Sequence, residues 1–536
     1  MSDTRQVVGT ADLNLIEAPV TLSAYLICGF ASFGGILNGY DSGYISGVLG
    51  MDYVKEHFGH SRSPTKEDPS EFIIPSSRKS LITSILSAGT FFGSLLGGVL
   101  SERFGRRITI MISCLIFSIG VAVQVATVNV AGLVAGRLIA GLGVGGVSST
   151  VILYVSEISP RKVRGLLVFG YQWAITIGLL LASGVAQGCK NIDGRSSYRI
   201  PIGLQFIWAV ILAGGLFLLP ESPRYYVKCG LTEDALRSLE RVRGQPRTHN
   251  AIQAELAEIQ ANYEYEKQIA STSWGDCFKG GFAPRGNLRR VIMGTGLQMF
   301  QQWTGINFIF YYGTTFFQEV GLKNPFLMST IMNVVNVVTT PASFYMIEKL
   351  GRRPLLIYGA AVMIFCEFIV AIVGVTKEGT HAASVCLIVF TCFYIATFAM
   401  TWGPGAWVVV GEIYPLPIRA KGVALATASN WIWNCVIAVI TPYMVDESEG
   451  NLKVKVFFIW GSALVLCLLF AFFIIPETKG LSLEQVDKML EETTPMTSAK
   501  WVPHETFAHE MGMLDKVEPS ISHYEQKATV TEHDAI

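Results

Sequence analysis

Charged residues are scarce in this sequence. Only 15% of its 536 residues are Asp, Glu, Lys or Arg, whereas 51% are hydrophobic, and the mean hydropathy is +0.43. An average soluble domain carries about 25% charged residues. Acidic and basic residues number 41 each, so the formal net charge is zero and nothing suggests nucleic acid as a partner. The composition predicts a protein that lies in a lipid bilayer.

Patterns typical of metal, haem and covalent chemistry are also lacking. The ten cysteines are scattered without metal-ligand spacing, and none of the eight histidines lies well inside an apolar run. The sequence shows no nucleophile–base set and no phosphate-binding loop, so we expect neither an enzyme nor a bound cofactor or metal. The N-terminal residues lack the basic, apolar and small-residue order of a signal peptide, so no cleavage is expected.

Apolar runs long enough to cross a bilayer recur along the chain. They form two sets of six, which predicts an all-α membrane protein with twelve spans in two six-helix bundles. The predicted spans lie at about 22–44, 81–100, 108–128, 131–154, 166–187, 200–220, 291–318, 325–347, 354–375, 384–411, 420–444 and 454–475.

The polar stretches between and around these runs complete the predicted domain organisation. Leu231–Arg243 and Ala251–Lys267 in the linker, and Leu481–Leu490 after the last span, have the pattern of amphipathic helices. Lys and Arg are more frequent in the loops on the side of the linker, which predicts that both termini are cytoplasmic. The expected domains are an N-terminal tail (1–21), a first bundle (22–220), a cytoplasmic helical linker (221–290), a second bundle (291–475) and a C-terminal tail (476–536).

Three charged motifs occur twice, once in each half, at a nearly constant offset. The pairs are Glu102-Arg-Phe-Gly-Arg-Arg107 with Glu348-Lys-Leu-Gly-Arg-Arg353, Glu157-Ile-Ser-Pro-Arg-Lys-Val-Arg-Gly165 with Glu412-Ile-Tyr-Pro-Leu-Pro-Ile-Arg-Ala-Lys-Gly422, and Pro220-Glu-Ser-Pro-Arg224 with Pro476-Glu-Thr-Lys-Gly480. Repeated halves of six spans, with a substrate site at their interface, are typical of secondary transporters. The repeats therefore predict a protein whose two halves rock about a central site.

The run from Gly296 to Gly313 is apolar but rich in amides. It contains Gln298, Gln301, Gln302, Thr304 and Asn307. Unpaired amides are unfavourable in hydrocarbon, so several on one span indicate an inward polar face, and amides both donate and accept as a hydroxyl-rich ligand requires. On one continuous helix Gln298, Gln302 and Asn307 fall near one face. The aromatic residues Trp303, Tyr311 and Tyr312 could add flat surface for a sugar ring. The alternative is that the amides only join neighbouring helices.

With these motifs, Gly39-Tyr-Asp-Ser-Gly43 and Gly136-Arg137, the chain resembles the sugar porter family of the major facilitator superfamily over about residues 24–490. The residues of these motifs are similar to those of fungal hexose transporters. The resemblance implies the major facilitator fold, a eukaryotic plasma membrane, and a monomer that moves a monosaccharide by alternating access. Glucose is the expected substrate, with xylose or other monosaccharides as further candidates.

The resemblance also carries functional roles to individual positions. The implied sugar-binding residues are Gln172, Gln301, Gln302, Asn307, Asn336, Trp407, Asn430 and Asn434. Phe33, Thr176, Gln298 and Trp431 are further candidates for the lining of the cavity. Gly403 and Pro404 are expected to let the tenth span bend, because proline removes a helix hydrogen bond.

A cytoplasmic gate is implied where charged residues follow the spans. Its expected members are Arg103, Arg106, Arg107, Glu157, Arg164, Glu221, Arg224, Arg352, Arg353, Glu412, Arg419 and Glu477. Carboxylate–guanidinium pairs among them could tie the two halves together in one state and separate in the other. The alternative is that these charges only anchor the helix ends at the cytoplasmic face.

Two charges inside the predicted spans bear on energy coupling. Asp41 lies in the first span and Arg137 in the fourth, and isolated charges there are strongly unfavourable. In the proton-coupled members of the family, the matching aspartate takes up a proton and its bond to the arginine breaks. Passive hexose carriers of yeast also keep an aspartate, so proton symport and facilitated diffusion both stay open. Glu367, in the ninth span, has no assigned role.

Two other functions compete with sugar transport. The first is a transporter-like glucose sensor, although such sensors usually carry a longer cytoplasmic tail than the sixty residues after Pro476. The second is a carrier of polyols, inositol or sugar acids. Acidic substrates would favour a cation in the cavity, and the implied positions are neutral amides and an aromatic side chain.

Overall fold

The computed structural model describes residues 21–502 except for short internal segments. The segments outside the description are 62–71, 161–163, 250, 254, 258, 261–262, 264–272, 284–285, 320–323, 378–379, 416–417, 447 and 482. Most of both predicted tails therefore lies outside the described residues. Part of the predicted helix Ala251–Lys267 lies outside them as well.

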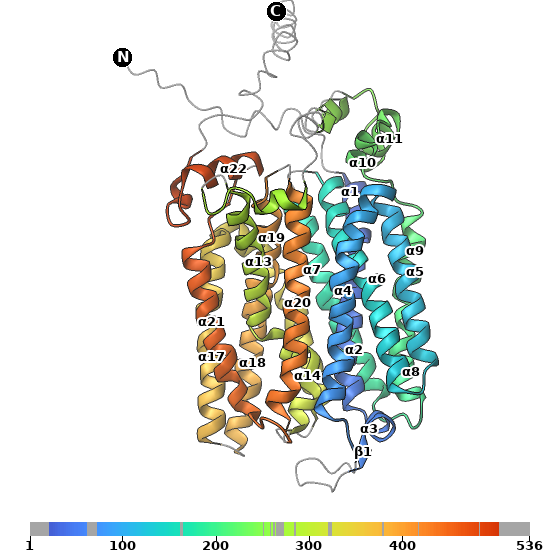
Figure 1. Ribbon diagram of the computed structural model, residues 1–536, viewed down its shortest axis with the longest axis vertical. Coiled ribbons are helices and arrows are strands. Elements are labelled where there is room, and N and C mark those ends of the chain that lie inside the picture. The colour runs from blue at the N-terminus through green and yellow to red at the C-terminus, as the bar shows by residue number, and fades with distance from the viewer. Residues whose placement is uncertain are drawn as a thin grey trace, which may run out of the picture.

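A first group of helices, which we call the first half, comes before the linker (Figure 1). It consists of α1 (Leu22–Ser32), α2 (Gly34–Gly50), α4 (Ser76–Phe104), α5 (Arg106–Ala126), α6 (Val130–Ile158), α7 (Arg164–Cys189), α8 (Ser196–Gly203) and α9 (Gln205–Leu216). Between α2 and α4 lie the short helix α3 (Asp52–Phe58) and a small antiparallel pair of strands, β1 (His60–Ser61) and β2 (Phe72–Ile73). The register pairs His60 with Ile73 and Ser61 with Phe72.

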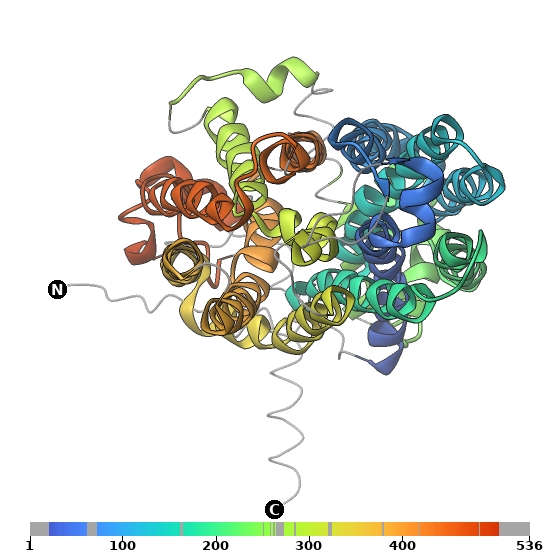
Figure 2. The same cartoon turned by 90° about the horizontal axis from the view of Figure 1, so that it is seen from below.

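A second group, the second half, follows the linker. It consists of α13 (Asn287–Trp303), α14 (Ile306–Glu319), α15 (Pro325–Thr339), α16 (Ala342–Leu350), α17 (Arg352–Thr376), α18 (His381–Met400), α19 (Trp402–Glu412), α20 (Arg419–Val445) and α21 (Val456–Phe473). Figure 2, viewed along the helices, shows the two groups side by side.

The linker and the segment after the last long helix contain short helices. They are α10 (Pro223–Lys228), α11 (Thr232–Arg243) and the 3-10 turn η3 (Trp274–Phe278) in the linker, and α22 (Leu483–Glu492) and η6 (Ser498–Lys500) after α21. A further 3-10 turn, η5 (Lys453–Lys455), lies between α20 and α21. The predicted amphipathic helices at 231–243 and 481–490 are thus confirmed as α11 and α22. The end of the molecule with α10, α11 and α22 is called the linker end, and the opposite end with α3 and β1 is called the hairpin end (Figure 1).

Ten helices in the described part of the chain are long and apolar enough to cross a membrane. The predicted all-α class is confirmed for the described residues, apart from the short β1–β2 pair. The predicted seventh and eighth spans do not appear as single long helices, because each is divided into two shorter ones, α13 with α14 and α15 with α16. The count of twelve spans therefore stays a prediction.

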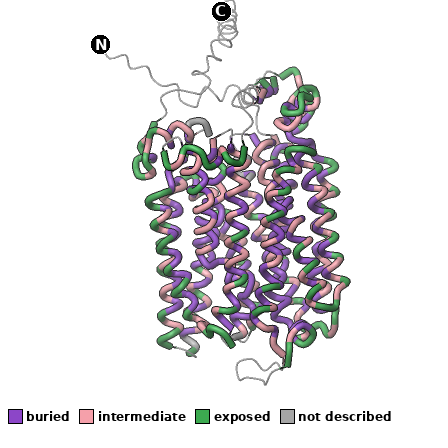
Figure 3. Tube along the Cα trace, viewed as in Figure 1, coloured by how far each residue is buried: buried purple, intermediate pink, exposed green. Residues whose placement is uncertain are grey.

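Each half has its own apolar core. Buried side chains from Ala24 to Val242 form one cluster, which also includes a few residues of the second half, and those from Cys277 to Leu490 form another. Figure 3 shows buried stretches running through the middle of both helix groups and exposed stretches along the outside. Because a lipid bilayer solvates apolar side chains, the exposed leucines and phenylalanines of the long helices are consistent with a lipid-facing surface.

Glycines let some helices approach closely. A Cβ atom added to Gly93 of α4 would overlap the carbonyl oxygen of Leu142 in α6, and one added to Gly39 of α2 would overlap that of Ile175 in α7. Small residues at helix contacts allow this kind of close packing inside membranes. The two helix pairs form a tightly packed interior for the first half.

Candidate functional site: a buried amide cluster between the halves

The amide-rich run is interrupted between two helices. Helix α13 ends at Trp303 and α14 begins at Ile306, and Gly305 between them has a φ angle of +89°. Side-chain-bearing L-residues rarely adopt this conformation, so glycine is favoured there. The amide-rich run is therefore not one continuous helix, although Gln298, Gln302 and Asn307 still reach one shared hydrogen-bond network with α20.

The break leaves carbonyl groups that hydroxyl groups satisfy. Thr304 Oγ1 donates to the carbonyl oxygen of Gln301 at 2.7 Å, and the Tyr394 hydroxyl donates to the carbonyl oxygen of Thr304 at 2.7 Å. Backbone groups that lose helical partners in the interior need such replacements. The break is therefore a stable part of the fold, held by α18.

Five of the predicted sugar-binding amides form one hydrogen-bonded network, here called the amide cluster: Gln301, Gln302, Asn307, Asn430 and Asn434. Gln301 Oε1 accepts from Asn430 Nδ2 at 2.8 Å and from Gln302 Nε2 at 3.4 Å. Gln302 Oε1 accepts from Asn434 Nδ2 at 3.1 Å and also from Asn307 Nδ2. The structure thus brings residues of α13, α14 and α20 together at one place.

Gln301 joins this cluster to a bend in the neighbouring helices. Its Nε2 donates to the carbonyl oxygens of Trp402 at 3.0 Å and Gly403 at 2.8 Å. Helix α18 ends at Met400, and Thr401, with φ −128° and ψ −81°, separates it from α19. The bend expected in the tenth span is confirmed, and it falls just before the Gly403–Pro404 pair.

Asn434 is the member of the cluster that contacts the first half. Its Oδ1 accepts from Ser87 Oγ of α4 at 2.6 Å and from the Tyr311 hydroxyl of α14 at 3.0 Å. Gln298, a weaker candidate from the sequence, also joins, since its Oε1 accepts from Asn430 Nδ2 at 2.7 Å. Ser87 was not among the predicted site residues, because a serine in an apolar run has no distinctive pattern.

The aromatic residues of the run have contacts of their own inside the protein. Tyr311 and Tyr312 are buried and use their hydroxyl groups, Tyr312 by donating to the carbonyl oxygen of Ala438 at 2.7 Å. Trp303 packs edge-on against Trp433 and Trp460. Tyr311 and Tyr312 pack with the apolar core of the first half, and Trp303 packs with that of the second half.

Three predicted sugar ligands lie outside the network. Gln172 of α7 and Trp407 of α19 are partly exposed, whereas Asn336 of α15 is buried. The residues that follow Gln172 and Asn336 form a hydrogen bond between the halves, in which Trp173 Nε1 donates to the carbonyl oxygen of Val337 at 3.1 Å. Among the described residues, no hydrogen bond engages these three side chains. Their donors and acceptors are available to a ligand.

The cluster is suited to a neutral ligand with many hydroxyl groups. Its members are amides without formal charge, and the oxygens of Gln301, Gln302 and Asn434 each accept two hydrogen bonds. A carbonyl oxygen has two lone pairs, so these acceptors are occupied, while further N–H groups of Gln302 and Asn434 stay available. The cluster can therefore donate to hydroxyl oxygens of a ligand.

Asp41 and Arg137 are both buried inside the first half, 0% and 1% exposed. Neither carboxylate oxygen of Asp41 has a hydrogen-bond partner among the described residues. Arg137 instead donates to the Tyr44 hydroxyl at 2.6 Å and lies 5.4 Å from the centre of its ring, and Tyr44 donates to Gln124 Oε1 at 2.7 Å. Tyr44, which was not identified from the sequence, accepts a hydrogen bond from Arg137, where Asp41 was the expected partner.

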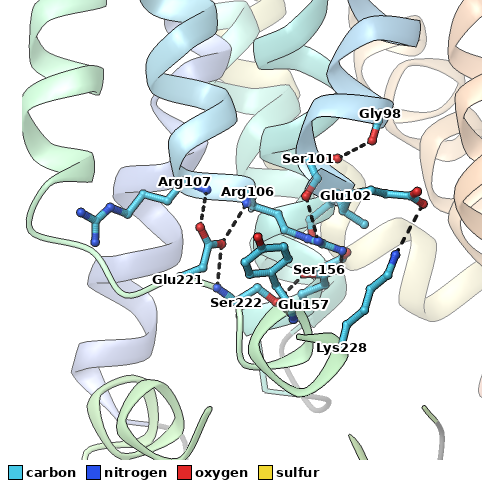
Figure 4. A network of polar contacts seen from close by, with 12 residues as sticks. Gly98, Ser101, Glu102, Arg106, Arg107, Ser156, Glu157, Glu221, Ser222 and Lys228 are labelled. Atoms are coloured by element: carbon cyan, nitrogen blue, oxygen red, sulfur yellow. Dashed lines mark hydrogen bonds and ion pairs between the residues drawn. The ribbon is translucent and has the colours of Figure 1, made fainter. Parts of the chain in front are cut away.

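At the linker end of the first half, a carboxylate closes the start of α5. Glu221 accepts from the backbone amides of Arg106 and Arg107, at 3.0 Å each, and Gly105 before them has a φ angle of +88° (Figure 4). A helix N-terminus favours negative charge, so this contact satisfies two free N–H groups. Burial raises the pKa of Glu221, and these amides oppose that effect.

The side chain of Arg106 forms a second contact there. Its Nη2 lies 2.7 Å from Glu157 Oε1, and Ser222 Oγ donates to the other oxygen of Glu157 (Figure 4). The three repeated motifs of the first half thus meet in one network, which links the start of α5 with the end of α6 and the segment after α9.

The second half repeats this network residue by residue. Glu477 accepts from the backbone amides of Arg352 and Arg353 at 3.0 and 3.2 Å. The Arg352 guanidinium pairs with Glu412 at 2.7 Å, and Thr478 Oγ1 donates to Glu412 at 2.6 Å. Both described ion pairs of the predicted gate, Arg106–Glu157 and Arg352–Glu412, lie within one half.

The other predicted gate residues also lie at the linker end. Arg103 is exposed near the end of α4, Arg224 is in the first turn of α10, and Arg419 begins α20 and donates to the carbonyl oxygen of Tyr414 at 3.2 Å. Arg164 begins α7, and its side chain lies outside the description.

We expect Glu477→Gln to lower the stability of the folded protein by about 1–3 kcal/mol, because one of the two partly buried backbone amides at the start of α17 loses its charged acceptor. The unfolding temperature of the purified protein in detergent measures this effect. Glu348→Gln, an exposed carboxylate of the same end, is the matched control and should change little. An equal unfolding temperature for both variants would show that the carboxylate at the helix start is unimportant.

At the hairpin end, a buried ion pair joins the two halves. Lys79 Nζ of α4 lies 2.8 Å from Asp446 Oδ1 at the end of α20, with both side chains less than a tenth exposed. Ser76 Oγ donates to the other oxygen of Asp446 at 2.6 Å, and Gln318 Nε2 donates to the carbonyl oxygen of Gly50 at 3.3 Å. The halves are therefore held together at this end.

Known proteins resemble the chain over most of its length. The family model described as sugar (and other) transporter matches residues 27–490. A major facilitator-type transporter of Aspergillus rugulosus is 44% identical over 90% of both chains, and a probable glucose transporter of Neurospora crassa is 44% identical over 86% of this chain and 78% of its own. A high glucose sensor of Saccharomyces cerevisiae is 42% identical over 88% of this chain and 61% of its own.

Among solved structures, the proton:xylose symporter XylE bound to 6-bromo-6-deoxy-D-glucose is similar, with a TM-score of 0.73. The two chains are 27% identical, over 88% of this chain and all of the other. The resemblance expected from the repeated motifs is thereby confirmed. The chain belongs to the sugar transporter family of the major facilitator superfamily.

Proposed function

We propose that the protein is a secondary transporter that moves a hexose, with glucose as the main substrate, across the plasma membrane by alternating access. The observation that carries this proposal is the amide cluster, an uncharged group of hydrogen-bonding side chains beside the contact between the halves. Gln172, Asn336 and Trp407 complete the proposed sugar site, and xylose or other monosaccharides are further candidate substrates. The similarity to a probable glucose transporter of Neurospora crassa supports this choice.

The proposed topology has twelve spans. Helices α13 and α14 together form the seventh crossing, and α15 and α16 the eighth, each interrupted where polar backbone is satisfied inside the protein. The linker end faces the cytoplasm, and both tails lie on that side. A monomer is sufficient, because both halves of the site come from one chain.

Proton symport is the proposed source of energy. Asp41 is buried without a hydrogen-bond partner among the described residues, and Arg137 is held by Tyr44. We propose that this arrangement represents the state after proton uptake, and that proton release returns Asp41 to Arg137. The named activity of XylE, a proton:xylose symporter, supports the coupling.

We propose that the charged network at the linker end of each half holds the helix ends of that half together. These two ends would contact each other when the cavity opens to the outside. The ion pairs Arg106–Glu157 and Arg352–Glu412 would then present matched surfaces to each other. Arg419, at the start of α20, is the proposed residue that faces across the interface.

Uptake of labelled glucose into yeast cells without their own hexose carriers tests the proposed function. We expect saturable uptake that unlabelled glucose competes for and sorbitol does not. The sensor hypothesis, supported by the 42% identity to the high glucose sensor, predicts a transcriptional response to glucose without uptake. Competition by polyols or sugar acids instead of hexoses would favour the remaining alternative.

A further inference from the structure

Asn434 Oδ1 is fully used in this conformation. It accepts from Ser87 Oγ of the first half at 2.6 Å and from Tyr311 of the second half at 3.0 Å, while Asn434 Nδ2 donates to Gln302 at 3.1 Å. A carbonyl oxygen accepts two hydrogen bonds along its lone pairs. No lone pair of this oxygen is left for a sugar hydroxyl.

Ser87 ends a row of contacts between α4 and α20 that starts at the hairpin end. Ser76 and Lys79 bind Asp446, Ser80 Oγ donates to the carbonyl oxygen of Val439 at 3.1 Å, and the Ser84 carbonyl oxygen accepts from Cys435 Sγ at 3.5 Å. Ser87 is the deepest contact of the row. Opening the hairpin end must separate α4 from α20 along this row.

Separation would change the two donors of Asn434 differently. Tyr311 belongs to the same half as Asn434 and would move with it, whereas Ser87 belongs to the other half. When the hairpin end opens, one lone pair of Asn434 Oδ1 becomes free. When it closes, the Ser87 hydroxyl occupies that lone pair again.

We propose that Ser87 is a positioning residue that promotes sugar release, by competing with a sugar hydroxyl for Asn434 Oδ1 when the hairpin end closes. The inference rests on the proposed transport function and on Asn434 as a sugar ligand. A sugar that enters from outside finds Asn434 Oδ1 able to accept a hydrogen bond from one of its hydroxyl groups. After closure the serine replaces that sugar hydroxyl, so the affinity of the site that opens to the cytoplasm is lower.

Replacing Ser87 by alanine should therefore tighten sugar binding from the cytoplasmic side. One neutral hydrogen bond corresponds to about a 3- to 10-fold decrease in the KM for efflux. The KM for influx should stay unchanged, and the maximal rate of influx should fall because release is slower. Ser87→Thr keeps the hydroxyl group and should retain the difference between efflux and influx. Damage to the fold would weaken binding rather than strengthen it.

The experiment compares influx and efflux of labelled glucose in proteoliposomes with oriented wild-type protein, Ser87→Ala, Ser87→Thr and Ser80→Ala. Ser80→Ala removes a contact of the same row that does not reach Asn434, and it should keep the wild-type efflux KM. An efflux KM for Ser87→Ala that is equal to or higher than that of the wild type overturns the inference.

The proposed function has a separate test in the same experiment. Wild-type protein that takes up no hexose contradicts the transport function itself, whereas normal wild-type transport with an unchanged Ser87→Ala efflux KM contradicts only the role of Ser87. If Ser87→Ala does not fold, Ser87→Cys, whose thiol is a weak donor, replaces it and should lower the efflux KM in the same direction.

Discussion

Replacing Asp41 by asparagine is expected to abolish uphill accumulation of glucose while preserving exchange of labelled for unlabelled sugar. Asparagine has nearly the same shape but cannot bind and release a proton. Asp41 is buried, and no described residue forms a hydrogen bond with its carboxylate oxygens, so the carboxyl group is placed to change its protonation state without breaking other contacts. The accumulation ratio should fall to about one, the value for passive equilibration.

Two measurements check this expectation in the same cells. Sugar-induced alkalinisation of a weakly buffered medium reports proton entry, and retained labelled sugar reports accumulation. Asp52→Asn, an exposed aspartate at the start of α3, is the control for a change of charge and should behave as wild type. Accumulation by Asp41→Asn at the wild-type level would rule out its coupling role, and a wild type without alkalinisation would support the passive carrier instead.

Replacing Gln302 by alanine is expected to raise the KM for glucose by about 10- to 100-fold, the equivalent of one or two hydrogen bonds to buried donors. Its Oε1 accepts from both Asn307 and Asn434, so the change removes a proposed sugar ligand and also releases two neighbouring amides. The maximal rate should fall less than the affinity does, because the helices around the cluster keep their packing.

Gln301→Ala is a useful contrast to this variant. Gln301 holds the carbonyl oxygens of Trp402 and Gly403 at the bend, so its loss should lower the amount of folded protein as well as the affinity. Gln253→Ala, in the exposed part of the linker, is the matched control for loss of a glutamine amide. A Gln302→Ala variant with unchanged affinity would show that the amide cluster only joins helices, the alternative that the sequence had left open.

The repeated motifs and the long apolar runs were enough to predict the helical class and the family. These patterns are predictive because each motif makes a defined local contact. The carboxylates of Glu221 and Glu477, for example, bind the backbone amides at the starts of helices. The interruption at Gly305 was missed, since hydropathy is averaged over a window in which one glycine has little weight. A helical projection assumes regular geometry, so it could not show the interruption either.

The contacts of the site were harder to predict than its residues. Asp41 and Arg137 were identified from their charge inside apolar runs, but Tyr44 as the partner of Arg137 was not, because tyrosines are common in membrane helices. Ser87 reaches Asn434 only because α4 and α20 pack together, and these helices are far apart in the sequence. Contacts of this kind depend on tertiary structure, which neither composition nor spacing reports.

Glu221 and Glu477 have a consequence for how the chain can be divided. Each comes after the last long helix of its half and binds the start of α5 or α17, so each half is tied from its end back to its middle. A polypeptide cut in the linker would leave both ties intact. If the first and second halves are expressed as two separate polypeptides in the same membrane, they should assemble into an active carrier.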